Sequence, residues 1–193
     1  MFNKMMGRTR YVVCRIMLHL SGSDVAPILG VLNSSAREAI DTEGDMEVLG
    51  EELVTICETL LQYDEYWTSA ANEGDVFWSE GEAGDYVQEL FTDSAQRYLS
   101  EAPGYDSDFD ESFSVPVTRN VVVMITVAFV GEVPQLEDDL SNIAALKEAL
   151  KALINLHYKQ KIRAVQVHFS PAQLGDELTS DQLLQYYTEL IPL

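Results

Sequence analysis

Two cysteines and three histidines are the side chains of this chain best suited to nucleophilic or metal chemistry. Cys14, His19 and His168 fall in segments that alternate as strands do, whereas Cys57 lies at helical spacing among apolar residues. A thiol nucleophile needs a lowered pKa, usually at a helix N-terminus or beside a base. Cys14 lies in mid-strand and not at a helix N-terminus, which speaks against a nucleophilic role. A small hydrolase or thiol enzyme using Cys14, His19 and His168 is therefore kept as the alternative interpretation. We predict that both cysteines are reduced, buried and unreactive.

The acidic run 106–111 imitates the beginning of a calcium-binding loop. The imitation fails where the geometry matters, because the sixth position is Glu111 rather than glycine and the twelfth is Val117 rather than glutamate. The histidines lack HExxH spacing and the cysteines form no CxxC pair. We therefore expect no metal site and a flexible acidic loop at about 101–114. Weak binding of divalent cations by this acidic protein is a second alternative.

Motifs for other catalytic chemistry are missing from the sequence. It contains no GxSxG nucleophile turn, no P-loop and no dinucleotide-binding glycine pattern. Acidic residues flank Gly81 and Gly84, and their negative charge would repel an anion bound there. We predict that the protein has no catalytic residues and no cofactor and is not an enzyme.

The charge of the chain is strongly acidic and unevenly distributed. Its 193 residues include 12 Lys and Arg against 32 Asp and Glu, which gives a net charge of −20. Residues 41–111 hold most of the acids and a single base, whereas the first 20 residues hold four bases and no acid. Nucleic-acid binding depends on Lys and Arg displacing counterions from phosphates, so we expect no nucleic-acid partner.

Hydrophobic periodicity predicts one α+β domain over residues 1–193, with helices packed on a small mixed sheet. The predicted strands lie near 10–20, 119–130 and 161–169. The predicted helices lie near 24–40, 45–62, 84–99, 141–156 and 180–187. The first strand alternates as if one face were buried, whereas 121–130 is apolar throughout and belongs in the middle of the sheet. The helix between the last two strands suggests a parallel, right-handed βαβ unit.

The segment 63–80 has no clear period and contains both tryptophans. Tyr66, Trp67 and Trp78 are candidate partner-binding residues, because Trp and Tyr dominate the energetics of protein interfaces. The alternative is that this segment is a loop folded over the helices as part of the core. Both interpretations stay open at this point.

Several segments together resemble a known family. They are the opening strand, the sequence LLQYDEYW at 60–67, the strand 121–130 followed by Gly131, and the runs AVQVHFSP at 164–171 and GDELTSDQLL at 175–184. These resemble the uncharacterised domain of unknown function 1517 family of cyanobacteria and chloroplasts. The closing sequence 187–190 is similar to the family's tyrosine-proline-x-leucine, with Thr188 in place of proline.

The resemblance implies a role in photosynthesis. The family's plant member is described as a fluctuating-light-acclimation protein that acts on photoprotection at chloroplast membranes without known catalysis. By resemblance, this chain would be a non-enzymatic regulatory or assembly module that acts through protein–protein contacts. Typical members carry a membrane helix ahead of this domain, and we expect the present chain to lack it.

The expected location is the cytoplasm or a stroma-like compartment, with peripheral association at the thylakoid through a protein partner. No signal peptide is expected, and the longest apolar run, 121–130, is too short for a membrane-spanning helix. Lys4, Arg8, Arg10 and Arg15 would give at most a weak, salt-sensitive contact with an acidic surface. We therefore expect no direct insertion into a membrane.

Overall fold

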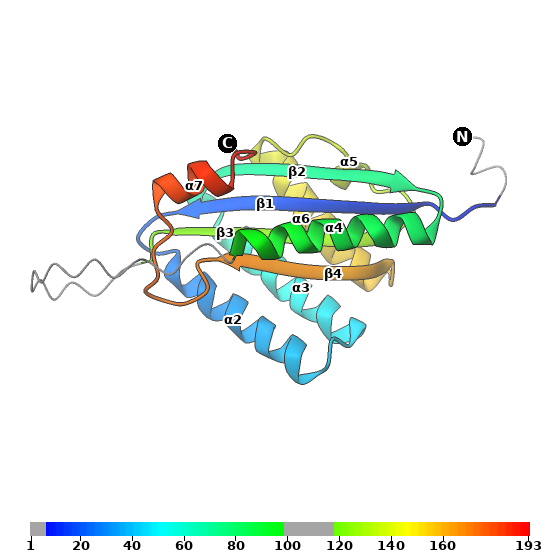
Figure 1. Ribbon diagram of the computed structural model, residues 1–193, viewed down its shortest axis with the longest axis horizontal. Helices are drawn as coiled ribbons and strands as arrows, with labels where there is room; N and C mark the ends of the chain where they lie inside the picture. Colours follow the sequence, from blue (N-terminus) through cyan, green and yellow to red (C-terminus); the bar gives the residue numbers. More distant parts are fainter. Residues whose placement is uncertain (1–6, 99–117) are drawn as a thin grey trace, which may run out of the picture.

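The middle strand of the sheet is the segment with the clearest apolar alternation, Tyr11–Ser21 (β1) (Figure 1). The computed structural model describes residues 7–98 and 118–193, and five strands pair into one sheet within them. On one side β1 pairs with Asn120–Val130 (β3), and on the other it pairs with Trp67–Phe77 (β2).

The two edges of the sheet differ in length. Ile162–Ser170 (β4) pairs with β3 along nearly its whole length and forms one edge. At the other side, the two residues Ile191–Pro192 (β5) pair with the beginning of β2. The strand order is β4-β3-β1-β2-β5, and every pairing is antiparallel.

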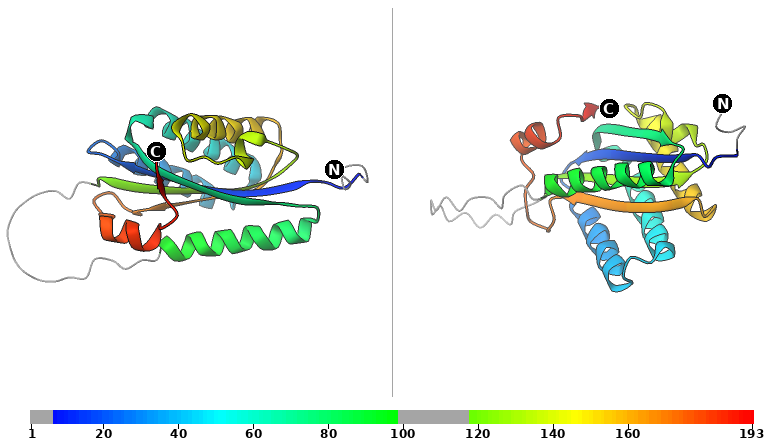
Figure 2. Two further views of the ribbon diagram at one scale, coloured as in Figure 1. Left: turned by 90° about the horizontal axis from the view of Figure 1, so that it is seen from above. Right: turned by 45° about the vertical axis from the view of Figure 1, so that its right-hand side comes forward.

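Helices cover both faces of the sheet, as the view from above shows (Figure 2). One face carries Ala26–Asp41 (α2), Met46–Gln62 (α3) and Ile143–Tyr158 (α6). The other face carries Glu80–Tyr98 (α4) and Ser180–Tyr186 (α7). Two short helical segments, Asp64–Tyr66 (η1) and Pro134–Glu137 (α5), lie in connections.

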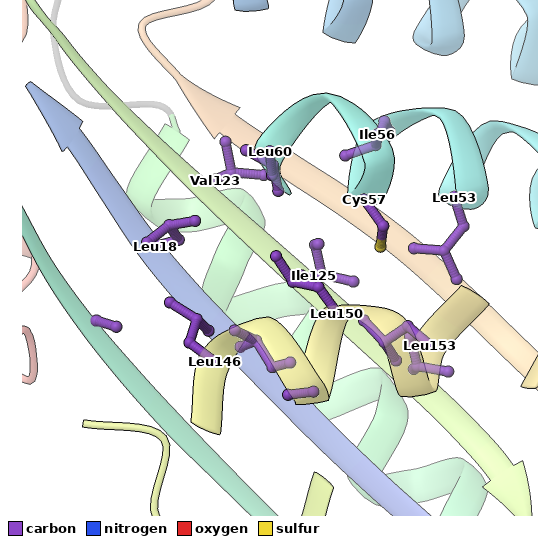
Figure 3. Close-up of a cluster of buried hydrophobic side chains, with 14 of the residues drawn as sticks. Leu18, Leu53, Ile56, Cys57, Leu60, Val123, Ile125, Leu146, Leu150 and Leu153 are labelled. Atoms are coloured by element: carbon purple, nitrogen blue, oxygen red, sulfur yellow. The ribbon is translucent and has the colours of Figure 1, made fainter. Parts of the chain in front are cut away.

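The main core lies between the sheet and α2, α3 and α6. The even-numbered residues of β1 and the odd-numbered residues of β3 point into it. Figure 3 shows Leu53, Cys57 and Leu60 of α3 on one side of Ile125, with Leu150 of α6 opposite. The opposite face holds two smaller apolar clusters, one beneath α4 and one beside α7.

The predicted α+β class is confirmed, but the mixed sheet and the parallel βαβ unit are wrong. The reason lies in residues 131–142, which carry the chain back from the end of β3 to the middle of β2, where Asn72 holds Asp138. Helix α6 then returns the chain to the end where β3 stopped, and the Val130 amide donates to the Lys161 carbonyl. Strand β4 therefore begins beside the end of β3 and runs antiparallel to it.

The sequence analysis also misjudged β1 and missed β2. Strand β1 is buried on both faces, because α4 and the polar side chains beneath it cover the face that was expected to be open. The small and polar residues of β2 have no apolar alternation, so no strand was predicted there. At Gly74 an added Cβ would approach the Val13 carbonyl to 2.6 Å, so a glycine is required in mid-strand. The predicted flexible loop at 101–114 lies outside the described residues.

Candidate functional site

The three aromatic candidates occupy two distant places. Trp67 is 7% exposed, lies in the main core and donates its Nε1 hydrogen to the Leu60 carbonyl at 3.1 Å. Tyr66 beside it is half-buried, and Trp78 is half-buried beyond the far end of β2. At about 3.3 Å per residue, the strand separates the two places by about 35 Å. The candidates therefore do not form one surface, and partner binding by them stays a prediction.

The cysteine and histidine candidates lie on opposite faces of the sheet. Cys14 points into the main core, and burial raises the pKa of its thiol to about 12. His19 lies on the other face, where its ring nitrogens contact Ser69 and Asn120. His168 lies on that second face as well, in register with Met124. Neither histidine is placed to activate Cys14, and the predicted burial of both cysteines is confirmed.

The bases near the start of the chain are engaged within the fold. Arg10 donates to a carboxylate oxygen of Glu137 at 3.0 Å and to the Gly131 carbonyl. Arg15 is 2% exposed and binds Glu73 on β2. The expectation that Arg15 helps to contact an acidic surface is therefore wrong, because its side chain is buried. Arg10 is half-buried and Arg8 is exposed, so a contact by these two stays a prediction. Lys4 lies outside the described residues.

A network of ion pairs lies beneath α4. Arg15 donates to Asp93 and to the Ser94 hydroxyl of α4, and Arg97 donates to Asp93 and to Glu189 near the C-terminus. The Arg97 guanidinium lowers the pKa of Glu189 below its ordinary value. Burial raises the pKa of Asp93, but the hydrogen bonds from Arg15 and Arg97 outweigh burial and lower that pKa overall. The network ties β1, β2, α4 and the C-terminal segment together, which is a structural role.

A groove of about 390 Å³ runs along the outer edge of β4, which has no strand partner among the described residues. Its walls come from α2 and α3 on one face of the sheet and from Phe91 of α4 on the other face. The consecutive residues Val165, Gln166 and Val167 all line it, although successive side chains of a strand point to opposite faces. A space bounded from both faces in this way must lie beyond the edge of the sheet. Figure 1 shows α2 and α3 extending past β4 on that side.

The lining of the groove is mostly apolar, with three polar exceptions, Ser35, Glu52 and Gln166. Ile40 of α2 is 75% exposed beside it, although a large aliphatic side chain gains by leaving water. Ser35 is 4% exposed, and its hydroxyl has no hydrogen-bond partner in the described part of the chain. Glu52 is the charged residue among the described side chains that line the groove. Such a groove suits an apolar group.

The turn that joins α2 to α3 surrounds one side of this groove with acids. Residues 38–52 hold seven carboxylates and no Lys or Arg. None of these carboxylates forms an ion pair with a base within residues 7–98 and 118–193; Asp45 caps the α3 N-terminus instead. The bases Lys159, Lys161 and Arg163 lie near the beginning of β4 but do not line the groove.

Sequence reasoning did not find this groove, because its parts are far apart in the chain. On α2, Ala36 and Ala39 continue the helical spacing of the buried residues Leu29 and Leu32, and Ile40 lies next to them. An exposed isoleucine next to these residues is the signal that was available. The open edge of β4 depends on the strand order, which local patterns do not determine.

The structure gives no sign of two other kinds of site in its described part. No three His, Cys, Asp or Glu side chains among the described residues gather where they could hold a metal ion. Across the same residues, no helix has the length and apolar character needed to cross a membrane.

Comparison with known proteins gives one match. A family model described as Protein of unknown function (DUF1517) matches residues 10–193. The match covers every strand and helix described above. No curated protein matches the chain, and no solved structure matches it.

Proposed function

The chain belongs to the DUF1517 family, and we propose that it is a non-enzymatic regulatory or assembly protein whose partner docks in the groove beside β4. The observation that carries this proposal is the groove itself, an apolar channel beyond an open sheet edge with Ile40 exposed at its side. Exposed apolar surface that a polar surface surrounds is typical of protein-binding sites.

We propose further that the function concerns the regulation of photosynthetic membranes. The support is the family resemblance, since the plant member is described as a factor for acclimation to fluctuating light. In this proposal the protein works in the cytoplasm or a stroma-like compartment and reaches the thylakoid through its partner. Deletion of the gene in its source organism would then impair growth in fluctuating light more than in constant light.

Capture from the source organism with matched variants tests the docking site. Ile40 on α2 and Leu184 on α7 are both 75% exposed aliphatic residues of helices on opposite faces of the sheet, so replacing either should leave the fold intact. We expect Ile40→Arg to reduce recovery of a specific partner by about tenfold or more and Leu184→Arg to leave it unchanged. Equal recovery with both variants would contradict the proposal.

A further inference from the structure

We propose that the groove receives an extended segment of another protein, with alternating apolar and basic residues, which pairs with β4 as an additional strand. This inference rests on the proposed function and names the chemistry of the partner. Strand β4 has nine residues, and its outer side has no strand partner among the described residues. A long edge of this kind offers backbone N–H and C=O groups to an extended peptide.

The groove lies where an added strand would run. Neighbouring strands of a sheet lie about 4.8 Å apart, so an added strand would occupy the space directly beyond β4. That space is already covered on both sides, by α2 and α3 on one side and by Phe91 of α4 on the other. An added strand would therefore be covered on both faces instead of lying on an exposed rim.

The walls indicate which side chains the added strand would present. Toward α2 and α3 the strand would meet Ala39, Ile40 and Leu53, which favour an aliphatic or aromatic residue at every second position. Ser35 also lies on this wall, and its buried hydroxyl has no hydrogen-bond partner among the described residues.

The charge around the groove favours a basic segment over a second copy of this chain. Residues 38–52 contribute seven carboxylates, and Glu52 lines the groove itself. Pairing two copies through their β4 edges would bring together chains of net charge −20 and two such acidic turns. Lys or Arg at the alternate positions of the added strand would instead complement these acids.

A peptide titration tests the inference on the full chain. The probe is a ten-residue peptide that alternates valine and lysine, and its binding is measured by fluorescence anisotropy at physiological salt. We expect saturable binding, which Ile40→Arg weakens about tenfold or more and the matched variant Leu184→Arg changes less than about twofold. A peptide that alternates valine and glutamate should bind about 100-fold more weakly.

Backbone methylation separates strand addition from simple charge attraction. In a strand, alternate residues direct their N–H and C=O groups to the same side. Two peptides of identical charge are compared, the first N-methylated at every valine and the second at every lysine. If the peptide binds as a strand, methylation at one of the two residue types should abolish binding and methylation at the other should not affect it. Bound peptide should also protect amides of 162–170 from hydrogen exchange.

Three outcomes would overturn the inference. They are equal binding of the two methylated peptides, exchange protection outside β4, and a dimer of the free chain that Ile40→Arg dissociates. Failure of the peptide while Ile40→Arg still abolishes partner capture would overturn strand addition and leave the proposed function standing. Loss of the Ile40 effect on partner capture would overturn the proposed function itself.

Discussion

The rest of the described chain covers one edge of the sheet and leaves the other uncovered. At the β2 edge, β5 pairs with Ser69 and Ala70, and the Leu193 amide donates to the Thr68 carbonyl. Farther along β2, the Asn72 side chain holds the connection 138–140 by two hydrogen bonds. At the β4 edge the described residues provide no comparable cover, and an apolar groove runs there instead.

We propose from this difference that the β4 edge, which has no strand partner among the described residues, is a functional feature. Unpaired strand edges promote aggregation, and proteins usually blunt them with charges, prolines, short strands or covering loops. The chain uses such devices at β2, where Pro192 lies in the covering strand and Asp75 caps the following amide. At β4 it leaves Val165 and Val167 beside the groove. An edge that is left open in this way, between helices that extend past it, is suited to a partner.

The largest loss of stability is expected from replacing Arg15, the buried arginine that binds Glu73 on β2. Arg15→Met would remove the bonds to Glu73, Asp93 and Ser94. Removing one partner of a buried ion pair costs about 3–5 kcal/mol, and because the carboxylates here are about 40% exposed we expect a loss of about 2 kcal/mol. Chemical denaturation measures it. Arg163→Met on β4 is the control and should stay within about 0.5 kcal/mol.

A smaller effect is expected from the side chain that covers the β2 edge. Asn72→Ala removes a donor to the Asp138 carbonyl and an acceptor from the Leu140 amide, so we expect a loss of about 1–2 kcal/mol in the free energy of unfolding. Gln166→Ala on the β4 edge should cost less than about 0.5 kcal/mol. Equal costs at the two positions, measured by urea denaturation, would contradict the view that the described residues cover β2 and leave β4 open.

The smallest effect is expected from acidification, which should loosen the C-terminal cover of β2 through loss of the ion pair between Arg97 and Glu189. Arg97 lowers the pKa of Glu189 below its ordinary value of 4.5, so this ion pair contributes stability above that pH. The contribution is lost as the pH falls through the folded-state pKa of Glu189. Since Glu189 is 40% exposed, solvent screens the pair and the effect is small.

Hydrogen exchange can follow this loosening residue by residue. On acidification from neutral pH to about pH 3, we expect the Leu193 amide to lose protection, while the amides of β4 that pair with β3 keep theirs. Arg97→Gln should cause the same loss at neutral pH. Protection of Leu193 that is independent of both pH and Arg97 would show that the C-terminal cover is held by other contacts.

The sequence predicted those parts of the fold that local patterns determine. The alternation of β1 and the apolar runs of β3 and of the helices were sufficient to place them. Strand β2 was missed because its residues are small or polar and its conformation depends on pairing with β1. The direction of β4 depends on the path of residues 131–142. The composition of this segment is that of an ordinary loop and does not indicate where the loop leads.

The candidate site was less accessible to sequence reasoning than the fold. Trp67 and Cys14 were singled out by residue type, and both lie in the main core. The groove takes residues from α2, α3, α4 and β4, and no local pattern relates these elements. The family match does not identify it either, because the family's function is unknown.

Site-specific photo-crosslinking at the two edges tests the central claim most directly. A photoreactive amino acid replaces Gln166 beside the groove in one variant and Asp75 on β2 in the other, since both positions are exposed. After irradiation in the source organism, the account predicts a covalent adduct with a second protein at position 166 and none at position 75. Adducts of equal yield at both positions, or an adduct at position 75 alone, would contradict it.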